Sequence, residues 1–465
     1  MKIGIVSISD ERPNANKRIR PVIEKQCNII LEMLAKIKDA EPVVAGEPIN
    51  TPQAARDAGR MLAHNKVCAT IFNLPTFGFP KFGVLISLFA PGPYLLISDL
   101  DSTQPSPAGV TGVGGAFTQL GIAHERLWTN IDSSYAQTVL TNFVQAAHVY
   151  HELRGQVLGV VGGRSMGLYP MVASSKEVMK TFGVEVDNID QHEIIRRMPE
   201  IPEEKVAHAM DWLKKNLKMI KYDTVLTVKK LQNQVRMYEV LKNIIREKQF
   251  DFTAVACHYE LSEYEQPMCI AAMLSNDPYD WDGEKPVHVY ACEADEDGAI
   301  TMRILNMIAN KPVCLLDTRY YDIKNDAYLF QNCGSAPSYF ACRSCNAHEN
   351  LAKTELLSCV PKFLGGGAHA RVVFGAGEFT LARLYQVENT YHMLMMRATA
   401  VPFEELDSMP EGEAHWPSVA MKINAPPEKL IENLNCVHLH AVEGDHIGKL
   451  LLLCKYFNIK PEAIE

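Results

Sequence analysis

Short apolar runs alternate with amphipathic stretches along the first third of the chain. The run KIGIVSI at 2–8 predicts a strand, and apolar residues at helical spacing over 21–37 predict a helix. Further strands are predicted at 41–46, 67–74 and 93–100, with helices between them. Strands that alternate with helices indicate a parallel sheet covered on both faces. The segment 75–115, rich in Pro and Gly, predicts long loops at one edge of that sheet.

The same alternation begins again after a helix predicted over 132–153. A strand at 156–163 leads into the Gly-rich turn 162–167, and two long helical stretches fill 203–249. The strands predicted in this part are 183–189, 251–257, 286–293 and 312–317.

From about residue 320 the pattern changes to antiparallel strands. The segments 369–386 and 436–444 alternate as strands do, and the next long helix is predicted at 446–457. The sequence therefore predicts an α/β protein with two doubly wound parallel-sheet domains followed by a β-rich C-terminal domain. The predicted boundaries are 1–154, 155–318 and 319–465.

Composition and charge restrict the classes of partner that we expect for this chain. Apolar residues make up 47% and charged residues 22% of the chain, as in ordinary globular proteins. The net charge is −9 and the sequence shows no basic run with interleaved aromatics, so nucleic acid is not expected as a partner. No apolar stretch approaches the ~18 residues that span a bilayer, and the first residues lack the zones of a signal peptide. We expect a cytoplasmic protein that binds no membrane.

Two carboxylates end two predicted strands of one strand–helix–strand unit. Glu293 ends the strand 286–293, and Asp317 ends the strand 312–317. A crossover helix makes such strands parallel, so both side chains are expected at the carboxyl edge of one sheet, where ligands bind. The strand 251–257 is expected to bring His258 and Glu260 to the same edge.

Facing carboxylates repel each other unless a cation lies between them. A divalent ion with an added imidazole would form a mixed oxygen and nitrogen site. His438 and His440 on one strand face, and His446 nearby, are candidates for the imidazole. A role in the core or on the surface of the β-rich domain is the alternative for each of them.

Twelve cysteines are spread along the chain, and most are expected to be reduced thiols. One cluster has donors at short spacing: Cys333, Cys342, Cys345, His348 and Cys359. Its spacing is tight for structural zinc and no second paired motif follows, so a loop with reduced thiols is favoured over a zinc site.

The residues around both carboxylates resemble a known family. The stretches CHYELSEYEQPMCIAAM and PVHVYACEADEDGAITMRILNMIANKPVCLLD resemble the metal-site region of the L-fucose isomerase and L-arabinose isomerase superfamily. The most specific part is C-E-x-D-x-x-G-A-[IL]-T, at Cys292 to Thr301, followed by a strand that ends in Asp317. NCVHLHAVEGD resembles the family's last ligand motif and selects His438 over His440.

Weaker matches extend this resemblance over the whole chain. They are Asp10 to Pro13, GGRSMG at 162–167, AGEFTLARL at 376–384 and His415-Trp416-Pro417. The chain is shorter than the fucose isomerases proper, and Val437 stands where the family usually has an Asn before the ligand His. It therefore resembles a divergent branch of the family.

The resemblance implies a metal-dependent aldose–ketose isomerase that acts on a monosaccharide through an enediol. It implies a divalent cation held by Glu293, Asp317 and His438, with Mn²⁺ expected and Mg²⁺ or Co²⁺ as alternatives. Glu293 and Asp317 are also the expected acid/base pair. The family further implies a homo-oligomer, commonly a hexamer.

Four more residues are candidates for substrate binding. Arg12 is expected to contact a substrate oxygen or charge from another subunit, with an ordinary salt bridge as the alternative. His258 and Glu260 are expected to hydrogen-bond sugar hydroxyls, with a strand-end turn as the alternative. Trp416 is a candidate to stack on a sugar face, with simple packing as the alternative.

Two other functions compete with the isomerase. Tandem α/β domains also form sugar-binding proteins, so a non-catalytic sugar-binding protein on the same fold is the main alternative. A nicotinamide dehydrogenase is the second, because the turn 162–167 has glycines and Asp187 lies about twenty residues further on. The glycine spacing differs from G-x-G-x-x-G, which makes this second signal weak.

Overall fold

The computed structural model describes residues 1–100, 103–359, 363–406 and 415–464. The chain forms two compact units. The first comprises Met1–Glu152 together with Gly448–Phe457, and the second comprises Leu153–Ile447 with the residues after Phe457. The boundary predicted at residue 318 lies inside the second unit and stays a prediction.

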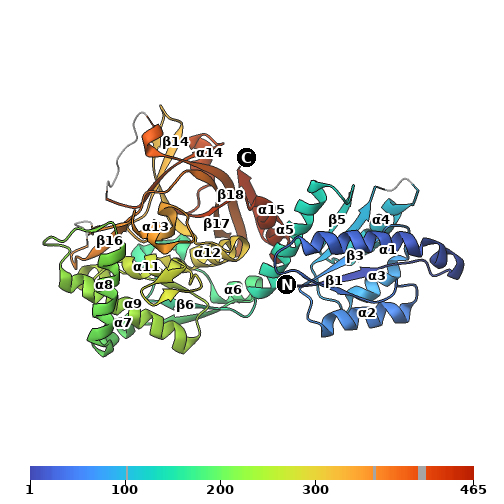
Figure 1. Ribbon diagram of the computed structural model, residues 1–465, viewed down its shortest axis with the longest axis horizontal. Coiled ribbons are helices and arrows are strands. Elements are labelled where there is room, and N and C mark those ends of the chain that lie inside the picture. Colours follow the sequence, from blue (N-terminus) through green and yellow to red (C-terminus); the bar gives the residue numbers. More distant parts are fainter. Residues whose placement is uncertain (101–102, 360–362, 407–414, 465) are drawn as a thin grey trace. The chain divides into compact units, whose positions relative to one another are not determined.

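The first unit is a five-stranded parallel sheet with helices on both faces (Figure 1). The strand order β2-β1-β3-β4-β5 is that of a doubly wound fold. The strands are β1 (Lys2–Ser7), β2 (Glu41–Val44), β3 (Ala69–Asn73), β4 (Tyr94–Asp99) and β5 (His124–Thr129). The helices are α1 (Pro13–Ala35), α2 (Pro52–His64), α3 (Pro80–Ser87), α4 (Ser106–Gln119), α5 (Ser134–Glu152) and α15 (Ile447–Phe457).

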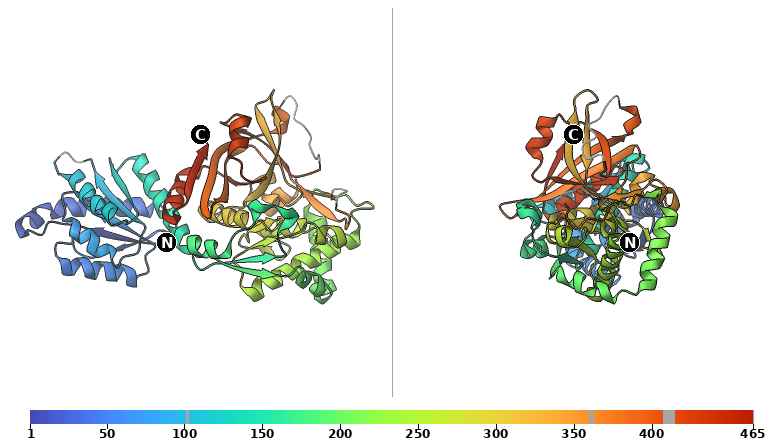
Figure 2. Two further views of the ribbon diagram at one scale, coloured as in Figure 1. Left: turned by 180° about the vertical axis from the view of Figure 1, so that it is seen from behind. Right: turned by 90° about the vertical axis from the view of Figure 1, so that its left-hand side faces the viewer.

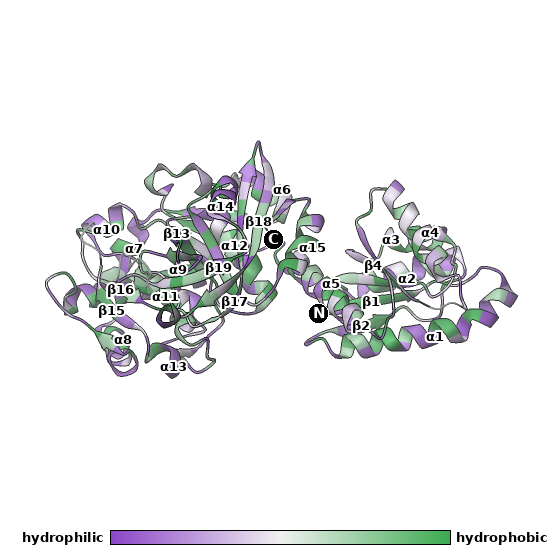
Figure 3. Ribbon diagram, turned by 90° about the horizontal axis from the view of Figure 1, so that it is seen from above, coloured by the Kyte–Doolittle hydropathy of each residue, from purple (hydrophilic) through white to green (hydrophobic). Residues whose placement is uncertain are grey.

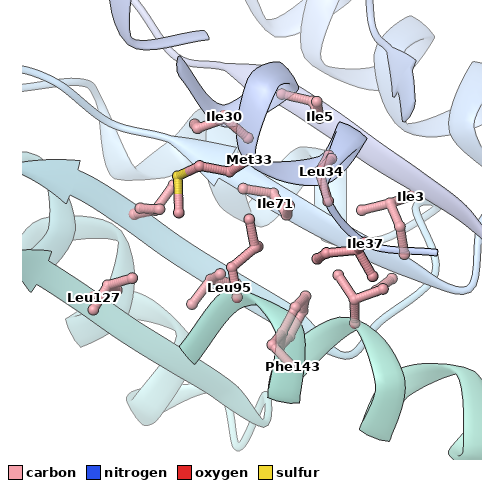
Figure 4. Close-up of a cluster of buried hydrophobic side chains, with 14 of the residues drawn as sticks. Ile3, Ile5, Ile30, Met33, Leu34, Ile37, Ile71, Leu95, Leu127 and Phe143 are labelled. Atoms are coloured by element: carbon pink, nitrogen blue, oxygen red, sulfur yellow. The ribbon is translucent and has the colours of Figure 1, made fainter. Parts of the chain in front are cut away.

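Two hydrophobic clusters cover the two faces of this sheet. On one face, Ile3 and Ile5 of β1 pack in a cluster with Leu34 of α1 and Phe143 of α5 (Figure 4). Side chains alternate along β1, so Val6 joins the cluster on the other face with residues of α2, α3 and α4. Figure 3 shows the matching alternation of hydrophobic and hydrophilic residues along α1.

The prediction of long loops over 75–115 is wrong, because this segment contains α3, β4 and α4. Pro80 is the first residue of α3, a position where a missing N–H costs nothing. A Cβ on Gly109 of α4 would lie only 2.2 Å from the carbonyl oxygen of Thr76, so this glycine permits close packing. Pro and Gly here start and pack helices.

The second unit contains a second parallel sheet, with the order β12-β9-β6-β7. Its strands are β6 (Val157–Val161), β7 (Glu185–Ile189), β9 (Phe252–Val255) and β12 (Tyr290–Cys292). The helices of this part are α6 (Ser175–Phe182), α7 (His192–Arg197), α8 (Glu203–Asn216), α9 (Val228–Lys248), α10 (Glu260–Tyr264), α11 (Cys269–Asn276) and α12 (Glu296–Ala309).

A mixed sheet follows, in the order β17-β20-β13-β14-β19-β18-β21. Strands β17 and β18 also pair, so six antiparallel strands close on themselves and β21 adds to β18 in parallel. The strands are β13 (Cys314–Asp322), β14 (Ala327–Gln331), β17 (Gly377–Val387), β18 (Thr390–Val401), β19 (Ser418–Ile423), β20 (His438–Glu443) and β21 (Lys460–Ile464). Helix α12 packs against β17 and β20, and Figure 2 shows this sheet in orange and red next to it.

Smaller elements complete the second unit. Strand β15 (Glu355–Ser358) pairs with β16 (Ala368–Arg371) and with β8 (Met219–Ile220), and β10 (Tyr279–Asp280) pairs with β11 (Gly283–Glu284). The remaining helices are α13 (Ala347–Leu351) and α14 (Pro427–Asn433). The structure thus confirms two parallel α/β sheets followed by a β-rich C-terminal sheet. No helix in the described parts of the chain has the length and apolar character needed to cross a membrane.

One predicted pairing is wrong and bears directly on the site. Strands β12 and β13 are joined by α12 as expected, but they do not lie in one parallel sheet. Strand β12 pairs with β9 in the parallel sheet, whereas β13 runs antiparallel to both of its neighbours, β14 and β20, in the C-terminal sheet. Glu293 and Asp317 therefore come from two different sheets.

Candidate functional site

Antiparallel pairing places Asp317 next to His438. Asp317 lies within β13, and His438 is the first residue of β20, directly opposite it in the register of the two strands. Side chains of directly opposed residues project from the same face of a sheet. Asp317 Oδ1 is 3.4 Å from His438 Nε2.

Glu293 reaches the same imidazole from the other sheet. It follows β12, and its backbone has a positive φ of 61°; the next residue, Ala294, also has a positive φ, of 49°. This sharp change of direction lies at the carboxyl edge of the parallel sheet, next to the segment that follows β9. Glu293 Oε2 is 3.6 Å from His438 Nε2. The structure therefore brings Glu293, Asp317 and His438 together.

A buried carboxylate orients His438 from behind. His438 Nδ1 donates to Asp295 Oδ2 at 2.8 Å, which leaves Nε2 directed at Glu293 and Asp317. Asp295 caps α12 by accepting the Gly298 amide, and it forms an ion pair with the fully buried Arg383 of β17. Carboxylate–histidine pairs of this kind fix the tautomer and the direction of a ligating nitrogen.

His440 lies on the same face of β20 as His438, and its ring lies near Asp295. Its Nε2 is 3.9 Å from Asp295 Oδ2, and burial lowers its pKa to about 3. A Cβ on Gly298 would lie 2.8 Å from this nitrogen, so the glycine of the motif leaves room for the ring. The structure thus places His438 beside Glu293 and Asp317, and His440 beside Asp295.

The electrostatics of the three residues call for a positive charge. Burial raises the pKa of Glu293 to about 7, and burial also raises the pKa of Asp317. Burial disfavours a charged His438, but the hydrogen bond to Asp295 and the nearby carboxylates raise its pKa to about 9. A divalent cation would supply the missing charge and would restore both carboxylates to their ionised form.

The donor set fits such a cation. Ligand atoms about 2.1 Å from one ion in octahedral geometry lie about 3 Å apart. Both carboxylates lie near this spacing from His438 Nε2, at 3.4 and 3.6 Å, and they would approach each other around the ion. Two carboxylates and one imidazole suit Mn²⁺ or Mg²⁺ better than a thiophilic ion. Glu293, Asp317 and His438 are hence the residues that would hold it.

The three donors open into a pocket of about 310 Å³, within the range of small-molecule sites. His258, which follows β9, lies in its wall with His258 Nε2 3.9 Å from Glu293 Oε1. Cys333 is also in the wall, and hydrogen bonds from Cys269 and Cys292 hold its pKa well below its ordinary value. The wall is completed by Met166, Leu168, Thr318, Arg319 and Val437.

Trp416 and Glu260 lie outside this pocket wall. Trp416 is buried, and the guanidinium of Arg319 stacks over its ring at 4.7 Å while donating to Asp317. Glu260 begins α10 and lines a neighbouring pocket of about 540 Å³, which shares His258 with the first. Trp416 thus supports Arg319, and the roles predicted for Trp416 and Glu260 toward a sugar stay predictions.

Arg12 lies in the first unit, at the residue before α1. Its side chain is 72% exposed and pairs with Asp10, to which it donates two side-chain hydrogen bonds at 2.9 and 2.6 Å. This ion pair is the alternative that the sequence suggested. A role for Arg12 toward the substrate of another subunit stays a prediction.

The cysteine cluster is dispersed in the structure. Two groups of three metal-type donors have all their ligand atoms within 4.8 Å of one another among the described residues, namely His258 with Glu293 and Cys333, and Asp295 with Cys436 and His438. Cys345 and His348 are exposed, and neither they nor Cys342 and Cys359 belong to these groups. Among the described residues, Cys333 therefore forms a metal-type group with other partners than those of the predicted cluster.

The dinucleotide signal also lacks its structural context. Helix α6 begins at Ser175, well after Gly167, so the glycine turn does not open a helix. Asp187 lies in the middle of β7 and not at its carboxyl end. Both observations remove support for the dehydrogenase alternative.

Comparison with known proteins decides the family. Residues 1–155 match the family described as "L-fucose isomerase, first N-terminal domain", and residues 330–464 match "L-fucose isomerase, C-terminal domain". The chain belongs to the L-fucose isomerase family. His438 lies within the second match, whereas Glu293 and Asp317 lie between the two.

Individual relatives agree with this assignment. The sulfoquinovose isomerase of Alkalicoccus urumqiensis is 21% identical over 340 residues, which cover 73% of this chain and 72% of that protein. The sulfoquinovose isomerase of Priestia aryabhattai is 22% identical over 73% of this chain and 74% of its own length. The L-fucose isomerase of Bacteroides fragilis strain YCH46 is 22% identical over 41% of this chain and 37% of its own length. These relatives are sugar isomerases, and the chain is an enzyme of the same sugar aldose–ketose isomerase family.

Sequence reasoning did not assign Asp295, Arg319, Cys333 or Arg383 to this site. Asp295 lies inside the quoted C-E-x-D motif, so that motif contained a signal for it. Arg383 lies inside the quoted segment 376–384 and Cys333 inside the predicted cysteine cluster, but neither signal connected these residues with the carboxylates.

Proposed function

We propose that the protein is a metal-dependent aldose–ketose isomerase that converts a monosaccharide through an enediol. The observation that carries the proposal is the convergence of Glu293 and Asp317, from two sheets, on the Nε2 atom of His438. We propose Mn²⁺ as the ion held by these residues, with Mg²⁺ or Co²⁺ as alternatives. When bound, the cation would polarise the sugar carbonyl and orient the two adjacent sugar oxygens.

The carboxylates supply the proton transfers. In aldose–ketose conversion a proton moves from C2 to C1, and a hydroxyl proton moves from O2 to O1. Each transfer needs a group within hydrogen-bond reach that can accept and return a proton. Glu293 and Asp317 are buried or partly buried in the pocket wall, with raised pKa values, and one of them can serve at carbon while the other serves at oxygen.

His258 is the best placed of the predicted substrate-binding residues. Its ring lies in the pocket wall beside Glu293, so it can hydrogen-bond a sugar hydroxyl next to the reacting carbons. Arg319 is the cationic side chain of the same wall, and it already forms an ion pair with Asp317. We infer that the pocket around the metal accepts the hydroxylated end of a sugar, and that a charged substituent would have to lie elsewhere.

A substrate panel tests the proposal. Neutral aldoses and 6-phosphorylated and 6-sulfonated aldoses are incubated with the protein and Mn²⁺, and ketose formation is measured. We expect at least one of them to be converted, with loss of conversion in Glu293→Gln and retention in Glu284→Gln, whose side chain lies in the exposed strand β11. Failure to convert any sugar while Mn²⁺ is bound would refute the assignment.

The wider properties of the family remain predictions for this chain. A homo-oligomer, commonly a hexamer, would allow Arg12 to act on the site of another subunit. Light scattering on the Mn²⁺-loaded protein measures the oligomeric state directly. Localisation in the cytoplasm likewise stays a prediction.

A further inference from the structure

Glu293 presents its two carboxylate oxygens to two different histidines. Oε2 faces His438 Nε2 at 3.6 Å, whereas Oε1 faces His258 Nε2 at 3.9 Å. The first oxygen belongs to the carboxylate-rich centre with Asp317. The second oxygen belongs to another group, in which donor atoms of His258, Glu293 and Cys333 all lie within 4.8 Å of one another.

The hydrogen bonds around His258 orient its ring for ligation. Ser262 Oγ donates to the Tyr259 carbonyl, so its lone pair is available to accept the Nδ1–H of His258 at 3.2 Å. The proton on Nδ1 leaves the lone pair of Nε2 directed toward Glu293 and Cys333. His258 also packs against Phe363, with ring centroids 4.6 Å apart, which holds the ring in this orientation.

Cys333 changes the chemistry of this second group. It lies in the loop after β14, is buried, and lines the same pocket as His258 and Glu293. Sulfur, imidazole nitrogen and one carboxylate oxygen are a typical zinc donor set, and a fourth position would face the pocket. Three protein ligands and an open position differ from the closed four-ligand sites that stabilise folds.

We propose that His258, Glu293 and Cys333 form a second metal site, selective for a thiophilic divalent cation such as Zn²⁺ or Cd²⁺. The site adjoins the centre of Glu293, Asp317 and His438 and shares Glu293 with it. Cys333 coordinates the ion as a thiolate, the form of sulfur that binds metals. A soft ion selects the site with sulfur, and a hard ion selects the site with two carboxylates.

The shared carboxylate gives the second site a consequence for activity. An ion on Oε1 would withdraw Glu293 from proton transfer, so Zn²⁺ or Cd²⁺ is expected to inhibit. This consequence rests on the proposed isomerase function, whereas the existence of the site does not. The test below therefore uses a spectroscopic signal that needs no substrate.

The experiment titrates Co²⁺, a spectroscopic substitute for Zn²⁺, into the metal-free protein. Coordination by a thiolate produces a charge-transfer absorption in the near ultraviolet, which oxygen and nitrogen ligands do not give. We expect this band in the unchanged protein, its displacement by Zn²⁺, and its loss in both Cys333→Ser and Cys333→Ala. Circular dichroism and thermal midpoints establish that each variant is folded.

Two matched variants separate this site from its neighbours. Cys345→Ser removes an exposed thiol of the dispersed cysteine cluster, and Asp317→Asn removes a donor of the carboxylate-rich centre only. Both are expected to keep the band. Absence of the band in the unchanged protein, its survival without Cys333, or its loss in Cys345→Ser would overturn the proposal. Loss of the band in Asp317→Asn would also overturn it, because the sulfur would then belong to a single centre.

Discussion

Asp295 is a buried side chain that orients His438, one of the proposed metal ligands, without being a proposed ligand itself. Its carboxylate accepts from His438 Nδ1, caps α12 and pairs with Arg383 at full burial. Burial alone would raise its pKa, but the charge of Arg383 and the hydrogen bond from His438 hold the pKa of Asp295 well below its ordinary value. Asp295 therefore acts as a permanent anion behind the imidazole.

Asp295→Asn should weaken Mn²⁺ binding although Asp295 is not a proposed ligand of the ion. Loss of such a supporting partner typically lowers metal affinity by about 10–100-fold. It also leaves Arg383 without its buried partner, which should lower the free energy of unfolding by about 3–5 kcal/mol. Mn²⁺ binding and urea unfolding measure the two effects. Asp445→Asn, which removes an exposed ion pair with Arg397, is the control and should change neither by much.

The carboxylate ligands should affect binding and turnover together. Asp317→Asn keeps the size of the side chain but removes its negative charge, so both Mn²⁺ binding and proton transfer should fail. We expect turnover to fall by about 10²–10⁴-fold. Asp322→Asn at the end of the same strand is the matched control. Equal losses in the two variants would show that the effect comes from β13 as an element and not from Asp317.

At the residue scale, the sequence singled out the candidate ligands but not the residues that support them. Glu293, Asp317 and His438 could be selected from a motif with strict spacing, but strand patterns alone left three histidines open. Cys333 and Arg383 reach the site from β14 and β17, and only the closed C-terminal sheet brings them there. Contacts between residues so distant in sequence leave no periodic signal.

Strand β13 is the element whose placement the sequence predicted least well. A helix between two strands usually returns the chain to the same sheet, which is why β12 and β13 were expected to be parallel neighbours. Strand β13 continues to Asp322 and pairs with β14 and β20 instead. The expectation that both carboxylates would lie close together was met for a different reason, because the two sheets meet at the start of α12.

Two histidines with lowered pKa values, one before β12 and one in β16, predict how the free energy of unfolding depends on pH. Burial lowers the pKa of His288, just before β12, to about 3 and that of His369, in β16, to about 4. Below the unfolded value of about 6.5 the unfolded chain binds protons that the folded chain does not, so stability falls as the pH falls. Each histidine should cost about 1.4 kcal/mol between about pH 7.5 and about pH 5.5.

Urea unfolding of the second unit at the two pH values measures this loss. His369→Gln should reduce the difference in the free energy of unfolding between the two pH values by about the contribution of one histidine. Gln can keep a donor for the His415 carbonyl, so the hydrogen bond is retained. His348→Gln replaces an exposed histidine and should leave the difference unchanged. A pH dependence that is the same in all three proteins would contradict the burial of His369 in its neutral form.

On the scale of the whole molecule, the chain returns to its first unit near its end. Helix α15 belongs to that unit, where Leu452 and Tyr456 pack against the core and Lys455 pairs with Glu125. Leu452→Ala removes part of this packing and should lower the free energy of unfolding of the first unit by about 0.5–3 kcal/mol.

Hydrogen exchange resolved along the chain measures this effect. Strands β1 to β5 should exchange faster in Leu452→Ala, while β6 and β9 should be unchanged. Leu451→Ala, at an exposed position of the same helix, should have little effect. Equal acceleration in both units would show that they do not unfold separately.

The most direct test of the account is a titration of Mn²⁺ into protein freed of metal by a chelator. Bound Mn²⁺ is measured by electron paramagnetic resonance, and ketose formation is measured in the same samples with the sugar that the panel identifies. We predict that turnover rises in proportion to bound Mn²⁺, and that Glu293→Gln and Asp317→Asn bind little and turn over little. Full turnover by the metal-free protein, or Mn²⁺ binding by both variants as tight as in the unchanged protein, would contradict the account.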